Sequence, residues 1–140
     1  MIESPSIPAA WSALFLGLFA IASAVGELRK PGMWRRMMGE LETSPALQIT
    51  LGLIELASGV LIYAAIGPWD GGDWLAVVTK ALATLMVLEA LAVCAFADRW
   101  IHFWVRRLGS DWRGWAVVAL LFGLWLTFAA IYRFYLTTPY

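Results

Sequence analysis

Two glutamates, Glu55 and Glu89, lie deep within long apolar segments of this 140-residue chain. Glu55 is nine residues from Ala46 and Glu89 is eight residues from Ala97, where these segments meet basic connections. At the rise of an α-helix the two carboxyl groups are therefore about 13 and 12 Å from the same end. A short connection joins the two segments, so we expect neighbouring helices that hold both carboxyl groups at matching depth.

Such a pair could carry protons or bind a ligand, because an ionisable group inside a membrane is a functional hypothesis by default. The alternative is structural: two protonated glutamates that hydrogen-bond between helices or contact another subunit. Both interpretations stay open at this point. Polar and small residues share the helix face of Glu55. The predicted intramembrane polar site comprises Glu55, Glu89, Ser58 and Gln48.

Neither a metal site nor an enzyme is indicated. A carboxylate-bridged metal site of the four-helix type uses a Glu-x-x-His motif, and the single histidine, His102, lies elsewhere. The single cysteine, Cys94, excludes an internal disulfide and a cysteine-based cluster. There is no nucleotide-binding loop, nucleophile elbow or metalloprotease motif. We therefore predict no catalytic residue, and the sequence names no cofactor, although His102 could in principle be an axial ligand to a haem or chlorin.

The composition describes the elements that must hold these residues. Hydrophobic residues are 61% and charged residues 14%, against roughly 45–50% and about 25% in soluble domains. A soluble monomer and a disordered chain are excluded, and a net charge of zero argues against a nucleic-acid binder. We predict an all-α polytopic membrane protein, with one domain over residues 1–140 and four transmembrane helices as a bundle. The spans are about 9–28, 46–66, 74–97 and 115–135.

Helix ends and helix contacts can also be predicted. Polar residues that suit an N-cap precede the four spans; they are Ser6, Ser44, Asp73 and Asp111. Small residues at helical spacing let helices approach closely in a membrane. The main ones are Ala13 and Gly17 in the first span, Gly52 and Gly59 in the second, and Gly123 and Thr127 in the fourth.

The basic residues predict the orientation. Eight of the ten lysines and arginines lie in two connections, residues 29–45 and 98–114. By the positive-inside rule these connections face the cytoplasm. We therefore expect an integral protein of a bacterial inner membrane with both termini on the outer, periplasmic side.

Both basic connections have the pattern of a short amphipathic helix lying in the membrane surface. In the segment 33–42 and in the segment 98–108, apolar residues recur at helical spacing opposite charged ones. We expect these two helices to contact lipid. The predicted interfacial residues are Arg35, Arg36, Arg106, Arg107, Trp34 and Trp104.

The remaining intramembrane charges are expected to act at the membrane boundaries. Lys80 lies on the face of its helix opposite Glu89 and can extend outward to the surface. Arg133 is predicted to be an interfacial anchor. Glu27 is expected to meet Arg29, Lys30 or lipid headgroups.

The two halves of the chain resemble each other. Arg35 and Arg106 are 71 residues apart, as are Gly52 and Gly123, and this offset is half the chain. A duplicated unit of helix, surface helix and helix would give a 2+2 repeat about an axis along the membrane normal. Chance similarity between two basic connections is the alternative.

These features predict a small integral membrane subunit with a structural, assembly or accessory role in a larger membrane protein complex. Its partners would be membrane lipids and other membrane protein subunits or further copies of itself, and no nucleic acid. Two alternatives are a homo-oligomeric proton-coupled transporter that uses Glu55 and Glu89, and a binder of quinone, pigment or lipid. The run 51–59 resembles, in a generic way, small bacterial four-span families such as the DoxX-like proteins, and it carries no residue role across.

Overall fold

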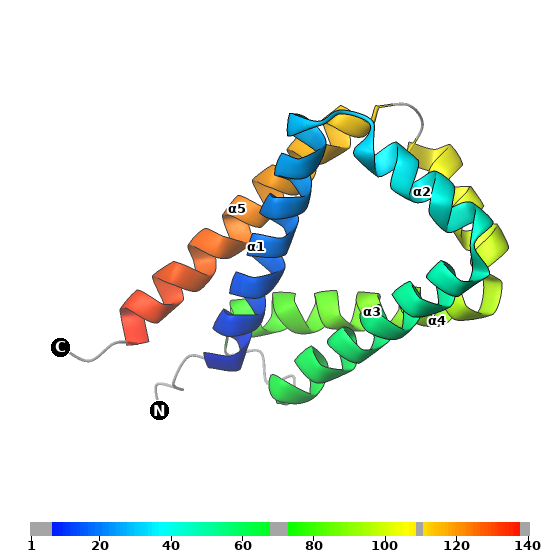
Figure 1. Ribbon diagram of the computed structural model, residues 1–140. Coiled ribbons are helices and arrows are strands. Elements are labelled where there is room, and N and C mark those ends of the chain that lie inside the picture. Colours follow the sequence, from blue (N-terminus) through cyan, green and yellow to red (C-terminus); the bar gives the residue numbers. More distant parts are fainter. Residues whose placement is uncertain (1–6, 68–72, 109–110, 138–140) are drawn as a thin grey trace.

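The computed structural model describes residues 7–67, 73–108 and 111–137 (Figure 1). Over these ranges the chain is helical. The elements are α1 (Ile7–Arg29), α2 (Met33–Thr43), α3 (Pro45–Ala65), α4 (Trp74–Leu108) and α5 (Trp112–Thr137). All of them except α2 are long and apolar enough to cross a membrane. The prediction of an all-helical chain with four membrane-length helices is confirmed.

Helix starts follow the predicted capping residues. The Ser44 hydroxyl accepts a hydrogen bond from Leu47 N at 3.3 Å, with Pro45 at the first helical position of α3. Asp73 accepts from Leu75 N at 3.0 Å, and Asp111 accepts from Gly114 N at 3.0 Å. These side chains satisfy backbone donors that have no partner inside the helix. The fourth predicted cap, Ser6, lies outside the described residues.

The corner between α1 and α2 is built by Glu27, which differs from the expectation for this residue. Its carboxylate accepts hydrogen bonds from Gly32 N at 3.1 Å and from Trp34 N at 2.8 Å. It does so almost fully buried, rather than against Arg29, Lys30 or headgroups. The physical reason is that Gly32, with φ of 95°, turns the chain so that the first amides of α2 face the end of α1.

The four long helices pack as two antiparallel pairs with glycines at the contacts. In the α1–α5 pair, a Cβ added at Gly17 would lie 2.9 Å from Gly123 O. In the α3–α4 pair, a Cβ added at Gly59 would lie 3.0 Å from Ala83 O, and one at Gly52 would lie 2.7 Å from Cys94 Sγ. The small residues therefore serve as contacts inside the chain, where close backbone approach gives the packing that lipid cannot drive.

The two pairs meet at one end. A buried cluster joins the start of α1, the start of α4 and the end of α5. Its members are Ala10, Ala13, Leu75, Leu126, Ala129 and Ala130. Asp73 and Arg133 reinforce this junction with an ion pair of 2.6 Å.

Away from this junction the pairs diverge. Figure 1 shows an angular frame in which α1 and α5 form one side and α3 and α4 another. Helix α2 and the end of α4 form the third side, and α2 lies between the end of α1 and the start of α3. The arrangement of the four long helices as a bundle, which the sequence predicted, stays a prediction.

Both basic connections are largely helical. The first contains α2, which starts at Met33. The second is the end of α4, which continues to Leu108 through non-helical backbone at Phe96 (φ −136°, ψ 41°). Helix α4 thus extends beyond the predicted end of its span at residue 97.

Candidate functional site

The side chains of Glu55 and Glu89 meet between α3 and α4, where their carboxyl groups are close enough to form a hydrogen bond. An ionised carboxylate only accepts hydrogen bonds, so a bond between two carboxyl groups requires one proton on the pair. The structure thus brings together the two glutamates that helix counting placed at matching depth. The pair can hold a proton between two oxygen atoms.

Close packing on both sides fixes this pair. Gly52 packs against Ala90 and Val93 on one side of it, and Gly59 packs against Ala83 and Val87 on the other. In an antiparallel pair of helices, the residue numbers of facing positions add to a nearly constant value. These contacts give values between 142 and 146, and 55 and 89 give 144, so Glu55 and Glu89 face each other in the same register. The two glycines let α3 and α4 approach closely enough for short side chains to meet.

The pair lies at the surface of the chain. Glu55 is half-buried and Glu89 is exposed. Their surroundings on both helices are large apolar side chains that are also exposed, among them Leu85, Leu88 and Ile54. A polar, protonatable pair is therefore presented on a surface that otherwise suits hydrocarbon.

The other two residues of the predicted polar site do not join the pair. Gln48 is buried, but its amide donates to Leu41 O at 2.8 Å and to Glu42 O at 3.4 Å, which ties α3 to the end of α2. Gln48 is two helical turns from Glu55, about 10 Å, and its side chain leans toward the start of α3. Ser58 donates to Ile54 O at 2.8 Å within its own helix.

Two other charged residues of the long helices, Lys80 and Arg133, lie toward the end of the molecule opposite the basic connections. Lys80 is buried, donates to the Gly67 carbonyl and lies 4.2 Å from the ring centroid of Tyr63. The side chain thus reaches toward the end of α3 but is buried there, whereas the sequence prediction had it extend to the surface. Arg133 pairs with Asp73 and its guanidinium lies 5.9 Å from the Trp74 ring, an interaction that sequence reasoning missed.

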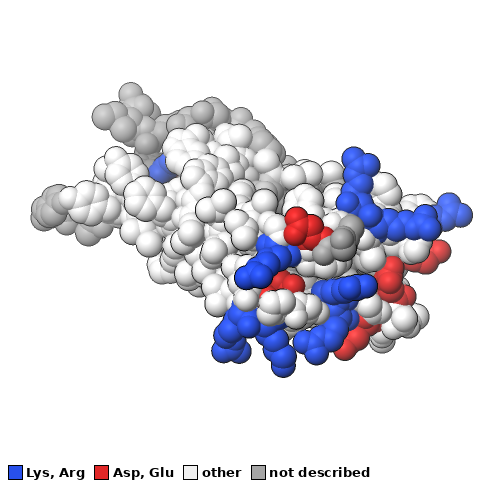
Figure 2. Space-filling model, turned by 90° about the horizontal axis from the view of Figure 1, so that it is seen from above, with Lys and Arg blue, Asp and Glu red and all other residues white. Residues whose placement is uncertain are grey.

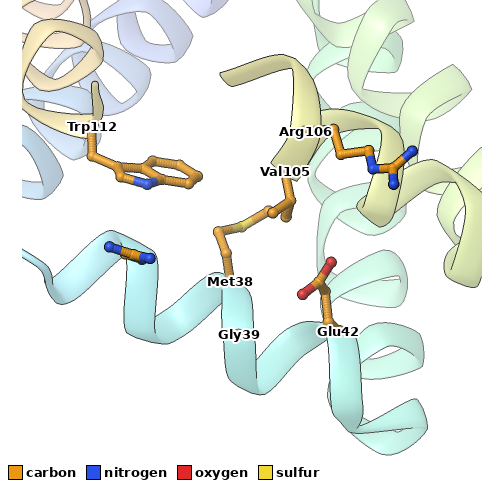
Figure 3. A pocket seen from close by; sticks show the side chains of 7 residues that line it. Met38, Gly39, Glu42, Val105, Arg106 and Trp112 are labelled. Carbon is orange, nitrogen blue, oxygen red and sulfur yellow. The ribbon is translucent and has the colours of Figure 1, made fainter. Parts of the chain in front are cut away.

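The basic residues gather at the other end of the frame, where Figure 2 shows them clustered on one face. A groove of about 480 Å³ lies there between α2, the end of α4 and the first turn of α5. It is lined by Arg35, Met38, Gly39, Glu42, Val105, Arg106 and Trp112 (Figure 3). Sequence reasoning named both arginines but did not place them at one groove. The signal that could have suggested a common site is the offset of 71 residues, which separates Arg35 from Arg106 and Arg36 from Arg107.

The other predicted interfacial residues do not line this groove. Trp34 donates from its indole to Ser23 O at 3.2 Å and so belongs to the corner between α1 and α2. Trp104 is partly exposed and contacts the rings of Trp100 and Phe103. Arg107 lines a second, shallow hollow on the end of α4, which shares Arg106 with the groove. Arg36 is exposed and lines neither of these two hollows.

His102 links the two helical basic segments. Its Nδ1 lies 3.4 Å from a carboxylate oxygen of Glu42, and both side chains are accessible to solvent. Over the ranges that the structure describes, no three His, Cys, Asp or Glu side chains are grouped so as to hold a metal ion. No family model, curated protein or solved structure matches this chain.

Proposed function

We propose that this chain is a small integral subunit with a structural or assembly role in a larger membrane protein complex. The observation that carries the proposal is the exposed side chain of Glu89, which meets Glu55 on an otherwise apolar surface. Polar groups in contact with hydrocarbon are costly, and such groups in membrane helices face protein or water in assembled structures. A neighbouring subunit would cover this pair and supply further hydrogen bonds.

The open arrangement of the helices supports the same proposal. Among the described residues, the buried cluster that joins the two helix pairs lies at one end, and the pairs diverge away from it (Figure 1). A helix from a partner could pack against the exposed apolar side chains of the α3–α4 pair. Association would use close packing and polar contacts, the two terms that act between helices in lipid.

Gentle solubilisation followed by native mass measurement tests this role. We expect the chain to co-purify with a different membrane protein at a fixed ratio. Glu89→Leu should weaken the association because it removes the polar contact, whereas Ser58→Ala, one turn from Glu55, should not. A chain that purifies alone as a monomer from every mild detergent would contradict the proposal.

A second candidate function is a homo-oligomeric, proton-coupled transporter. The close approach of the Glu55 and Glu89 carboxyl groups favours it, because such a pair can accept and release a proton. In that case native mass would show several copies of this chain and no other protein. Glutamine at either position would then abolish transport while leaving the oligomer intact, since an amide cannot titrate.

We also propose that the chain is a duplicated unit. Gly123, in the second half, packs on Gly17 and Ile21 of α1. Gly52, in the first half and 71 residues earlier, packs on Ala90 and Val93 of α4. Gly123 of the second half thus packs on α1, the first helix of the first half, and Gly52 of the first half packs on α4, the first helix of the second half. Such reciprocal contacts are expected when two halves are related by a two-fold axis. The basic ends would face the cytoplasm of a bacterial inner membrane, with α2 and the end of α4 at the lipid surface.

A further inference from the structure

The groove at the basic end combines two cationic groups with apolar walls. Arg35 comes from α2 and Arg106 from the end of α4, and both side chains are exposed. Neither guanidinium forms an ion pair or a hydrogen bond with any residue that the structure describes. Figure 3 shows Trp112 and Met38 directed toward the space between the helices. Two uncommitted guanidinium groups therefore flank a partly apolar hollow.

Guanidinium groups recognise phosphate oxygens with paired, charge-assisted hydrogen bonds. The acidic residue in the lining, Glu42, lies 3.4 Å from His102 on α4, so part of its hydrogen-bonding capacity is engaged there. The groove volume, about 480 Å³, lies within the range of small-molecule sites, roughly 300–1,000 Å³. An anion that carries apolar groups fits this lining better than a bare ion does.

We infer that this groove binds the phosphate headgroup of an acidic phospholipid, with Arg35 and Arg106 on the phosphate and with Met38, Val105 and Trp112 against the glycerol and first acyl carbons. Charge complementarity favours this occupant. Eight of the ten basic residues lie in the two segments around the groove, and Figure 2 shows this end covered by them. Basic pockets between helices on the cytoplasmic side of membrane proteins suit anionic headgroups. The inference does not depend on the subunit role.

Native mass measurement of lipid adducts tests the inference. The full chain in detergent is mixed with equal amounts of phosphatidylglycerol and phosphatidylcholine, and the retained lipids are counted. We expect one phosphatidylglycerol to be retained in preference. Arg35→Gln with Arg106→Gln should lower its affinity tenfold or more, roughly the effect of losing charge-assisted hydrogen bonds.

Arg36→Gln with Arg107→Gln is the matched control. It removes the same charge from the same two helices, but neither residue lines the groove. The control should keep the affinity within about twofold at physiological salt, because exposed charges outside a site are screened. Equal losses in the two double variants would overturn the inference, since diffuse attraction would then explain the binding.

A variant that fills the groove without removing a charge distinguishes binding inside the groove from general attraction to its arginines. A Cβ added at Gly39 meets nothing within 4 Å, so Gly39→Leu fits the helix and fills space at the groove. It should weaken phosphatidylglycerol retention with every arginine in place. Retention unchanged in Gly39→Leu, or displacement of the lipid by millimolar inorganic phosphate, would contradict a lipid site in this groove.

Discussion

Glu55 and Glu89 meet between α3 and α4, at a depth from which neither side chain can reach the basic end of its helix. A hydrogen bond between two carboxyl groups needs a proton, so we expect the two residues to act as one unit. Both candidate functions, the subunit role and proton transport, depend on this pair of ionisable residues within the membrane-length helices.

The carboxyl pair should retain a proton at neutral pH. Fourier-transform infrared spectra of the reconstituted protein should show the band of a protonated carboxyl, and Glu55→Gln with Glu89→Gln should remove it. The two single substitutions should also be non-additive in stability, by about 0.5 kcal/mol or more, because each alters the partner of the other. Glu40→Gln, on the exposed surface of α2, is the control. Strictly additive substitutions and no protonated band would contradict a shared proton.

The contact between α1 and α5 should not tolerate a side chain at Gly17. A Cβ there would collide with Thr127 Oγ1 and with the backbone of Gly123, so Gly17→Ala should destabilise the chain by about 1–3 kcal/mol. Gly39→Ala is the matched control, because its Cβ would meet open space and alanine favours a helix by roughly 0.5–1 kcal/mol. Denaturation in mixed micelles measures both. A neutral Gly17→Ala would show that α1 and α5 do not pack this closely.

The ion pair of Asp73 and Arg133 should hold α4 to α5 where the two helix pairs meet. Both side chains are largely buried, with Asp73 16% and Arg133 11% exposed. Arg133→Met removes one charged partner of Asp73 and should cost about 1–3 kcal/mol in the free energy of unfolding. Tyr132→Phe, at the exposed neighbouring position, should leave stability unchanged. Equal stability of Arg133→Met and the wild type would mean that the buried cluster alone joins the pairs.

The predicted orientation can be tested by cysteine labelling in intact cells. The background carries Cys94→Ala, because this thiol is exposed on the chain. A membrane-impermeant reagent should label Ser4→Cys and Gly71→Cys, and it should not label Ser44→Cys, because the basic connections face inward. Labelling at position 44 without permeabilisation would reverse the topology, and it would also place the proposed lipid groove in the outer leaflet.

Regular helices made part of this architecture predictable. The spans, the caps at Ser44, Asp73 and Asp111, and the matching depth of Glu55 and Glu89 follow from local pattern and from counting residues along a helix. Each of these properties depends on one helix or on two helices joined by a short connection.

Contacts between elements distant in sequence were not predictable. The pairing of Arg133 with Asp73 requires that the end of α5 lies beside the start of α4. The groove requires that α2 meets the end of α4. Gln48 was assigned to the carboxyl pair by its helix face, yet its side chain reaches back to α2, since a buried amide takes the nearest free carbonyls. Glu27 likewise serves the amides that the turn at Gly32 presents to it.

Photo-crosslinking beside the carboxyl pair tests the proposed subunit role most directly. A photoreactive residue at Leu88, next to Glu89 and 58% exposed, is compared in intact membranes with one at Phe128, which is 72% exposed in the other helix pair. The account predicts a discrete adduct at position 88 with a different membrane protein, and no adduct of that mass at position 128. Lipid adducts alone at position 88, or an adduct formed only between copies of this chain, would contradict it.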